Sequence, residues 1–171
     1  MNHRVQMDTP IGVLTIESNE KAITLIALPP EAGEHTLPDN GTRPGPVATG
    51  PDDGQLPEPL VAAVAQLEEY FAGHRRTFDL PLELEGTDFQ RSVWLQLAEI
   101  PYGETVSYAE MALMVGRPHA FRAVGQANGA NPIPIVLPCH RVVASGGGLG
   151  GYGGGLPMKR QLLRLEGVQI S

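Results

Sequence analysis

The sequence has a single cysteine and lacks any long apolar segment. One cysteine in 171 residues excludes an intramolecular disulfide framework and any zinc site with two or more thiolates. The five histidines show no ligand spacing, so we expect no metal. The longest apolar run, residues 22–28, is interrupted by Thr24 and is too short to span a bilayer. Because the N-terminus also lacks the apolar core of a signal peptide, we expect a cytoplasmic protein without membrane contact.

The chain also lacks an overall positive charge. Its net charge is −7, but residues 1–100 hold six Lys/Arg against sixteen Asp/Glu, whereas residues 101–171 hold six against three. Salt limits the attraction of phosphate to about 8–10 Å, so a local basic face can bind nucleic acid on an acidic protein. The alternative is an asymmetry without function.

The first half of the chain predicts an α/β domain over residues 1–84. Short β-prone segments separated by turns predict a small antiparallel sheet over residues 4–9, 11–17 and 21–28. Residues 29–59 contain eight of the sixteen prolines and show no periodicity, which predicts a long surface loop. The apolar spacing of residues 59–73 predicts a helix. Residues 78–84 alternate around a proline and predict at most an edge strand.

The second half begins with two well-marked helix starts. Thr87 or Asp88 is a suitable N-cap for a helix that runs through Leu97. Ser107 and Glu110 have the S-x-x-E spacing of a capping box, which predicts the start of a second helix.

Two further helices complete a predicted, mainly helical domain over residues 85–171. Pro118 is a good first-turn residue for a helix over residues 118–128. With the preceding helix it forms a pattern that resembles a helix-turn-helix, although any small helical domain packs helix pairs. Residues 157–166 predict the last helix. The eight glycines within residues 146–155 indicate either a flexible loop or one whose backbone approaches a ligand closely.

The segment around Cys139 holds the candidate chemistry. A lone cysteine among apolar residues is often an inert core residue, but His140 and Arg141 follow it and favour a thiolate. Neighbouring side chains diverge, so His140 does not face Cys139 directly. A base that acts through one water remains within reach.

Glu166 is the candidate partner of His140. It lies in the last turn of its predicted helix, where the helix dipole disfavours a negative charge. Either it is an exposed carboxylate or it has a partner elsewhere, for which imidazolium is the natural candidate. Cys139, His140 and Glu166 then form a nucleophile, base and orienting group. Asn131 belongs to an ordinary turn dipeptide but can also brace the site.

Several segments in order resemble the O6-alkylguanine-DNA alkyltransferase family, also called methylated-DNA–protein-cysteine methyltransferases. The similarity extends over residues 86–167 and is carried by Ile100-Pro-Tyr-Gly-Glu-Thr-Val-Ser-Tyr, Phe121-Arg-Ala-Val-Gly, Asn128-Gly-Ala-Asn-Pro-Ile-Pro-Ile-Val-Leu-Pro-Cys-His-Arg-Val-Val, Gly151-Tyr-Gly-Gly-Gly-Leu and Leu162-Leu-Arg-Leu-Glu-Gly. The resemblance implies a small N-terminal α/β domain, an antiparallel sheet with a helix, packed on a mainly helical C-terminal domain with a helix-turn-helix.

The resemblance also implies roles for the candidate residues. Cys139 would accept the alkyl group, His140 would be its water-relayed base, and Glu166 would orient His140. Asn131 would stabilise the turn that holds Cys139. Tyr108 would donate a proton as guanine leaves and would help to rotate the target phosphate.

The same resemblance places DNA contacts on the second helix of the motif. Arg122 would fill the stack after extrusion of the damaged base, while Ala123 and Gly125 would permit close approach to the minor groove. Phe121 departs from the small residue expected there. The main chains of Val142 and Gly153 would read the guanine edge. The wall of the pocket would be Tyr152.

The implied reaction is a single irreversible transfer from O6-alkylguanine to sulfur. We expect a monomer that uses no cofactor and acts on double-stranded DNA containing alkylated guanine, with O4-alkylthymine as a further possible substrate. Zinc bound by some relatives is not expected here, because Cys139 is the only cysteine. Two alternatives remain: a non-enzymatic lesion-binding protein, and a thiol hydrolase or ligase acting on a small substrate.

Overall fold

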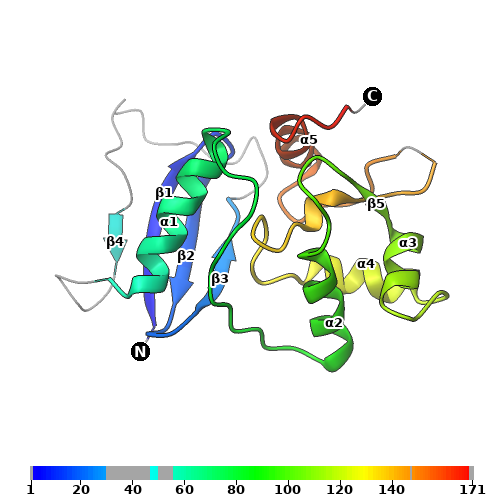
Figure 1. Cartoon of the computed structure of the whole chain (residues 1–171), viewed down its shortest axis with the longest axis horizontal. Coiled ribbons are helices and arrows are strands. Elements are labelled where there is room, and N and C mark those ends of the chain that lie inside the picture. Colours follow the sequence, from blue (N-terminus) through cyan, green and yellow to red (C-terminus); the bar gives the residue numbers. More distant parts are fainter. Residues whose placement is uncertain (1, 30–46, 50–55, 147, 170–171) are drawn as a thin grey trace. The chain divides into compact units, whose positions relative to one another are not determined.

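The chain forms two compact units, Met1–Glu83 and Leu84–Ser171 (Figure 1). The computed structural model describes residues 2–29, 47–49, 56–146 and 148–169. Within these residues, no helix has the length and apolar character needed to cross a membrane.

The first unit contains a four-stranded antiparallel sheet in the order β3-β2-β1-β4. The predicted strands are confirmed as β1 (His3–Thr9), β2 (Gly12–Ser18) and β3 (Ile23–Ala27). Alternate residues of β1 are buried because successive side chains of a strand point to opposite faces. The interpretation of residues 29–59 as one long loop was wrong at β4 (Val47–Thr49), which pairs with β1. Most of that segment lies outside the described residues.

The helix that the apolar spacing predicted is confirmed as α1 (Glu58–Phe71). It packs on β1 and β2. Its buried face consists of Pro59, Leu60, Ala63, Val64, Leu67 and Tyr70. The predicted edge strand at residues 78–84 forms only one bridge, between Leu82 and Ile23 of β3. Pro81 has no N–H to donate to a ladder, which explains why the pairing stays short.

In the second unit, both predicted helix starts are confirmed. Helix α2 (Asp88–Leu97) has Thr87 as its N-cap, and helix α3 (Tyr108–Met114) has Ser107. In both helices, the side chain three residues after the N-cap, Gln90 or Glu110, accepts a hydrogen bond from the N-cap backbone N–H and so completes the capping box. The local hydrogen bonds of these residues therefore decide where the helices begin.

Helix α4 (Phe121–Gly129) follows α3 and packs against it and against α2, which completes the predicted helix-turn-helix (Figure 1). The prediction that α4 begins at Pro118 was wrong by three residues. The N–H of Ala120 instead donates to the Arg117 carbonyl, so Pro118 occupies the second position of a tight turn, where its fixed φ is equally suitable. Trp94 Nε1 donates to the Ala127 carbonyl at 2.8 Å and joins α2 to α4.

The remaining elements surround Cys139. The short 3-10 helix η1 (Cys139–Arg141) leads into β6 (Val142–Val143), which pairs in parallel with β5 (Val106–Ser107). Helix α5 (Leu156–Leu165) packs on η1. It lies close to the predicted range, and Gly167, with φ of 83°, follows its end.

Candidate active site

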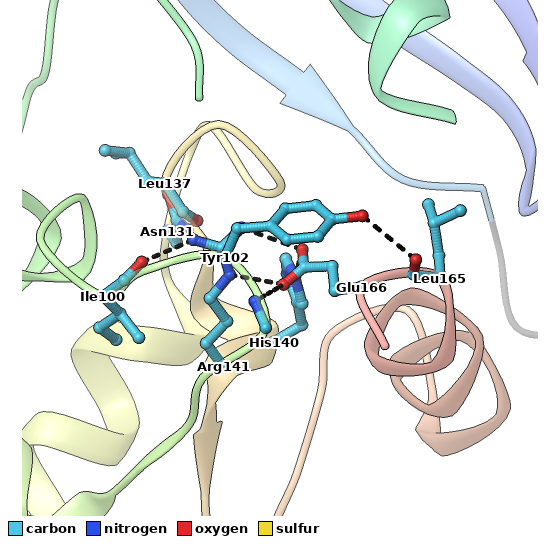
Figure 2. Close-up of polar contacts among 9 residues, drawn as sticks. Ile100, Tyr102, Asn131, Leu137, His140, Arg141, Leu165 and Glu166 are labelled. Atoms are coloured by element: carbon cyan, nitrogen blue, oxygen red, sulfur yellow. Dashed lines mark hydrogen bonds and ion pairs between the residues drawn. The ribbon is translucent and has the colours of Figure 1, made fainter. Parts of the chain in front are cut away.

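The carboxylate of Glu166 is the centre of a buried hydrogen-bond network (Figure 2). Arg141 donates to it twice, from Nε at 2.7 Å and from Nη2 at 3.0 Å. His140 Nε2 lies 2.6 Å from its second oxygen. Glu166 caps the C-terminal end of α5, where the dipole opposes its charge. His140 and Arg141 are the partners that offset the unfavourable position of the Glu166 charge. The sequence analysis predicted His140 as a partner but not Arg141.

His140 is fully buried and presents one nitrogen to Glu166. Burial lowers the pKa of His140, and the hydrogen bond and charge of Glu166 oppose this shift only in part. The ring is therefore neutral at physiological pH, and a proton on Nε2 points to the carboxylate. Nδ1 has no hydrogen-bond partner within the described part of the chain. In this tautomer Nδ1 is an acceptor, which is the property that a base needs.

Cys139 is 5% exposed and begins η1. Burial raises the pKa of its thiol to about 11, although a hydrogen bond from Asn131 and the charge of Lys159 lower it. The resting sulfur is thus a thiol at neutral pH and must lose its proton before it can attack. Arg141 was interpreted as a group that favours the thiolate, but its guanidinium instead binds Glu166 and the Ile100 carbonyl.

The turn before Cys139 is braced by Asn131. Its Nδ2 donates to the Leu137 carbonyl at 2.7 Å, and its Oδ1 accepts from the Ile133 N–H at 2.9 Å. Between them Ile135 has φ of 74°, a conformation that β-branched residues rarely adopt. The surrounding hydrogen bonds hold this strained loop. They therefore fix the direction in which the chain enters η1 at Cys139.

Lys159 is a site residue that the sequence analysis missed. Its ammonium is fully buried and donates to the carbonyls of Val142, Leu149 and Gly151. Burial lowers the pKa of Lys159 to about 8, while the nearby Cys139 raises it. The amphipathic spacing of α5 predicts that position 159 is buried. Only the structure shows that the lysine there donates hydrogen bonds to three carbonyls.

The glycine-rich segment lies against Tyr108. A Cβ on Gly150, whose φ is 74°, would lie 2.7 Å from the Tyr108 ring, so only glycine permits this approach. Burial raises the pKa of Tyr108, and a main-chain hydrogen bond with Gly151 lowers it. The backbone of the glycine-rich segment therefore closely approaches a tyrosine side chain, and its predicted close approach to a ligand stays a prediction.

Tyr152 and Val142 also lie near Cys139. Burial raises the pKa of Tyr152 well above its ordinary value, and the charges of Cys139 and Glu166 add to the shift. The Tyr152 hydroxyl has no hydrogen-bond partner in the described residues. The carbonyl of Val142 accepts from Lys159, which leaves it a second lone pair. Gly153 is exposed, and space is open where a Cβ would lie.

The start of α4 presents two exposed side chains. Phe121 is 52% exposed, and Arg122 beside it is also exposed. The smaller residues Ala123 and Gly125 are partly buried, and Gly125 lies behind the Tyr108 ring. The helix therefore has an exposed cationic and aromatic end, and its next turn packs toward the site.

The chain combines a small sheet-and-helix unit, a helix-turn-helix and the residues Cys139, His140 and Glu166. Comparison with known proteins identifies its family. Residues 3–84 match the ribonuclease-like domain of 6-O-methylguanine DNA methyltransferase, and residues 88–168 match its DNA binding domain. The chain therefore belongs to the 6-O-methylguanine DNA methyltransferase family, as its motifs predicted.

Individual relatives extend over almost the whole chain. A methylated-DNA–protein-cysteine methyltransferase of Mycobacterium tuberculosis is 45% identical, over 97% of this chain and 93% of its own length. The constitutive enzyme of Bacillus subtilis is 42% identical, over 98% and 97%. A crystal structure of Mycobacterium tuberculosis OGT in complex with DNA is 46% identical with a TM-score of 0.76, covering 94% of this chain and 90% of that chain.

Proposed function

We propose that this protein repairs DNA by moving the alkyl group of O6-alkylguanine onto Sγ of Cys139. The observation that carries the proposal is a buried thiol, followed in the chain by a buried histidine whose Nε2 lies 2.6 Å from a buried glutamate. The relatives named as methylated-DNA–protein-cysteine methyltransferases support the same chemistry. We expect the substrate to be double-stranded DNA that contains alkylated guanine. We also expect the protein to act on it as a monomer in the cytoplasm.

The first step removes the thiol proton. A water between Sγ of Cys139 and Nδ1 of His140 would carry the proton to the imidazole, because Nδ1 is buried and unpartnered among the described residues. Glu166 would stabilise the imidazolium that forms. Arg141 holds the Glu166 carboxylate in place through two hydrogen bonds, from Nε and from Nη2.

The second step transfers the alkyl group. The sulfur attacks the alkyl carbon, the S–C bond forms, and the O6–C bond breaks with its electron pair going to guanine. Guanine then takes a proton from Tyr108, whose raised pKa keeps it protonated until this moment. The thiol proton held by His140 then returns to the Tyr108 oxygen through solvent, so that no net charge or proton is left over. A thioether has no easy route back to thiol, so each chain would act once.

DNA would be bound by the helix-turn-helix. A buried alkyl group is accessible only if the nucleotide leaves the stack, at a cost of a few kcal/mol. The exposed Arg122 at the start of α4 would fill the vacated position, since a guanidinium can both stack and contact phosphate. The extruded base would lie between Tyr152 and the main chains of Val142 and Gly153. The relative solved with DNA supports nucleic acid as the partner.

Intact mass spectrometry after mixing with O6-methylguanine duplex tests the proposal. We expect a stable gain of about 14 Da on Cys139, one methyl in place of a hydrogen. Cys139→Ala should abolish the gain while keeping most of the affinity for the lesion. Demethylation that continues through many turnovers would instead indicate a hydrolase. Tight lesion binding by the unmodified chain without any adduct would indicate a binding protein, and either result would overturn the proposal.

A further inference from the structure

The turn of residues 100–103 has no role in the transfer proposed above, but its main chain contacts both members of the buried ion pair. The Ile100 carbonyl accepts from Arg141 Nη1 at 2.6 Å, and the Gly103 N–H donates to Glu166 Oε1 at 3.4 Å. Gly103 has φ of 82°, and a Cβ there would lie 3.2 Å from the main-chain oxygen of Glu166. The turn is therefore closely fitted to the Arg141–Glu166 pair.

Tyr102 joins this turn to both sides of the pair. Its ring lies over the Arg141 guanidinium, with 5.7 Å between the ring centroid and Cζ. Its hydroxyl donates to the carbonyl of Leu165, the residue before Glu166, at 3.1 Å (Figure 2). The side chains of Arg141 and Glu166 are 6% and 0% exposed, whereas Tyr102 is only partly buried. The ring therefore separates one face of the guanidinium from solvent.

Exclusion of water matters at Glu166 because the same carboxylate contacts His140. Charged hydrogen bonds are stronger in a region of low dielectric, and they weaken where water competes for the same atoms. A buried ion pair also needs good geometry and further hydrogen bonds to offset its desolvation. Tyr102 provides for both needs, since its ring covers Arg141 and its hydroxyl holds the chain next to Glu166.

We propose that Tyr102 is a positioning residue that keeps water from the Arg141–Glu166 pair and so holds His140 in one tautomer. With the carboxylate held against Nε2, the His140 ring keeps Nδ1 without a proton and able to accept one from the Cys139 thiol. Tyr102 acts through Glu166 and not on the substrate. This inference rests on the proposed role of His140 as the base of the alkyl transfer.

Two substitutions separate the ring of Tyr102 from its hydroxyl. Tyr102→Phe keeps the ring over Arg141 and is the matched control for Tyr102→Leu, which loses both contacts. Single-turnover transfer from O6-methylguanine duplex and alkylation of Cys139 by iodoacetamide are measured for each variant, alone and with Glu166→Gln. Urea midpoints check that each variant is folded. Tyr102→Met, with an adaptable side chain, repeats the test if the leucine variant does not fold.

Nitrogen NMR of the histidine rings gives a direct readout of the tautomer. The His140 signals are assigned with His140→Gln, which also provides the second background if Glu166→Gln does not fold. We expect a proton on Nε2 alone in the wild type and in Tyr102→Phe. In Tyr102→Leu we expect a mixture of the two tautomers.

We expect Tyr102→Leu to slow both reactions by about 10–100-fold, since a misplaced group costs roughly this much. The two losses should be similar, because one proton acceptor serves both reactions. Tyr102→Phe should stay within about 5-fold of the wild type, the equivalent of one neutral hydrogen bond. With Glu166→Gln, the leucine substitution should cost less than about 3-fold more, because the group through which it acts is gone.

Four results would overturn the inference. An unchanged His140 tautomer in Tyr102→Leu would leave Tyr102 a purely structural role. Equal losses in Tyr102→Phe and Tyr102→Leu would exclude the ring as the cause. Effects that multiply with those of Glu166→Gln would show that Tyr102 acts independently of the carboxylate. Slow transfer from DNA with a normal iodoacetamide rate would place Tyr102 in substrate binding.

Failure of the proposed alkyl transfer is distinguishable from failure of this inference. The wild-type protein would then carry no methyl on Cys139 after mixing with the duplex. The iodoacetamide rates and the His140 tautomer would still report on Tyr102.

Discussion

Three of the ionisable side chains at the site, Cys139, His140 and Lys159, have pKa values that burial moves away from their ordinary ranges. Burial is the first cause for each: it raises the pKa of Cys139 to about 11 and lowers the pKa of His140 and of Lys159, the last to about 8. At neutral pH the site therefore holds a thiol, a neutral imidazole and an ammonium. The thiol proton must move during the reaction that we propose, and we propose that His140 accepts it.

The rate of transfer should depend on pH through His140 and Lys159. His140 accepts a proton only while neutral, and its lowered pKa means that the rate falls only at a pH below the ordinary histidine value of about 6.5. Near pH 8 Lys159 loses a proton, and a neutral amine has two hydrogens for three carbonyls. We therefore expect a bell-shaped profile of single-turnover rate against pH.

Lys159→Met provides the control for the alkaline side. The variant should be slower at neutral pH by roughly tenfold and should lose the decline near pH 8, because the titrating group is absent. A wild-type rate that climbs steadily toward pH 11 would instead indicate that the free thiolate is the nucleophile and that the water relay is unnecessary.

The sequence predicted the residues that we propose to react, but not every residue that contacts them in the structure. Cys139, His140 and Glu166 lie in recognisable motifs, and the unfavourable position of Glu166 on its helix predicted a partner. Lys159 has no such signal. Its contacts depend on three main-chain carbonyls brought together from other segments, which neither periodicity nor capping rules describe.

At the level of elements, the glycine-rich segment offers a sharp test. Gly150→Ala would place a Cβ 2.7 Å from the Tyr108 ring at a φ of 74°, so the ring or the loop must shift. We expect a loss of transfer rate of at least about tenfold, since the shifted groups include the proton donor. Gly148→Ala is the matched control, because its Cβ would meet Ala144 at an ordinary 3.6 Å. Equal rates for the two variants would contradict the assigned role of the loop.

Arg122, at the exposed start of helix α4, should be required for repair of duplex DNA and not for the chemistry. Arg122→Ala removes the side chain expected to fill the vacated stack, so transfer from duplex should slow by about 10–100-fold. Reaction with free O6-alkylguanine base should change little, since no extrusion is involved. Parallel rates on the two substrates measure the difference. An equal loss on both would place Arg122 in the pocket rather than in the groove.

Element boundaries followed the sequence where local hydrogen bonds decide them. The capping boxes at Thr87 and Ser107 are local, and both helix starts were predicted correctly. Pro118 suits either a first helical turn or a tight turn, and the hydrogen bond from the Ala120 N–H to the Arg117 carbonyl shows the second. Strand β4 was missed because its pairing with β1 joins residues far apart in the chain.

On the scale of the whole molecule, the acidic charge limits how DNA is bound. Of the six Lys/Arg in residues 101–171, Arg141 and Lys159 are buried and bonded, which leaves Arg117, Arg122, Arg160 and Arg164 exposed. Each phosphate contact contributes about 0.9 to the slope of log affinity against log salt, so the slope should not exceed about 4. Fluorescence anisotropy across salt concentrations measures it. A much steeper slope would require basic groups from the first unit.

We propose that Cys139 accepts one alkyl group and is then spent. A titration of the protein with duplex carrying radiolabelled O6-methylguanine, followed by peptide mapping, measures this directly. Label transfer should stop at one methyl per chain, all of it on the peptide that contains Cys139. Label released to solvent, label on another residue, or transfer that continues beyond one equivalent would contradict it.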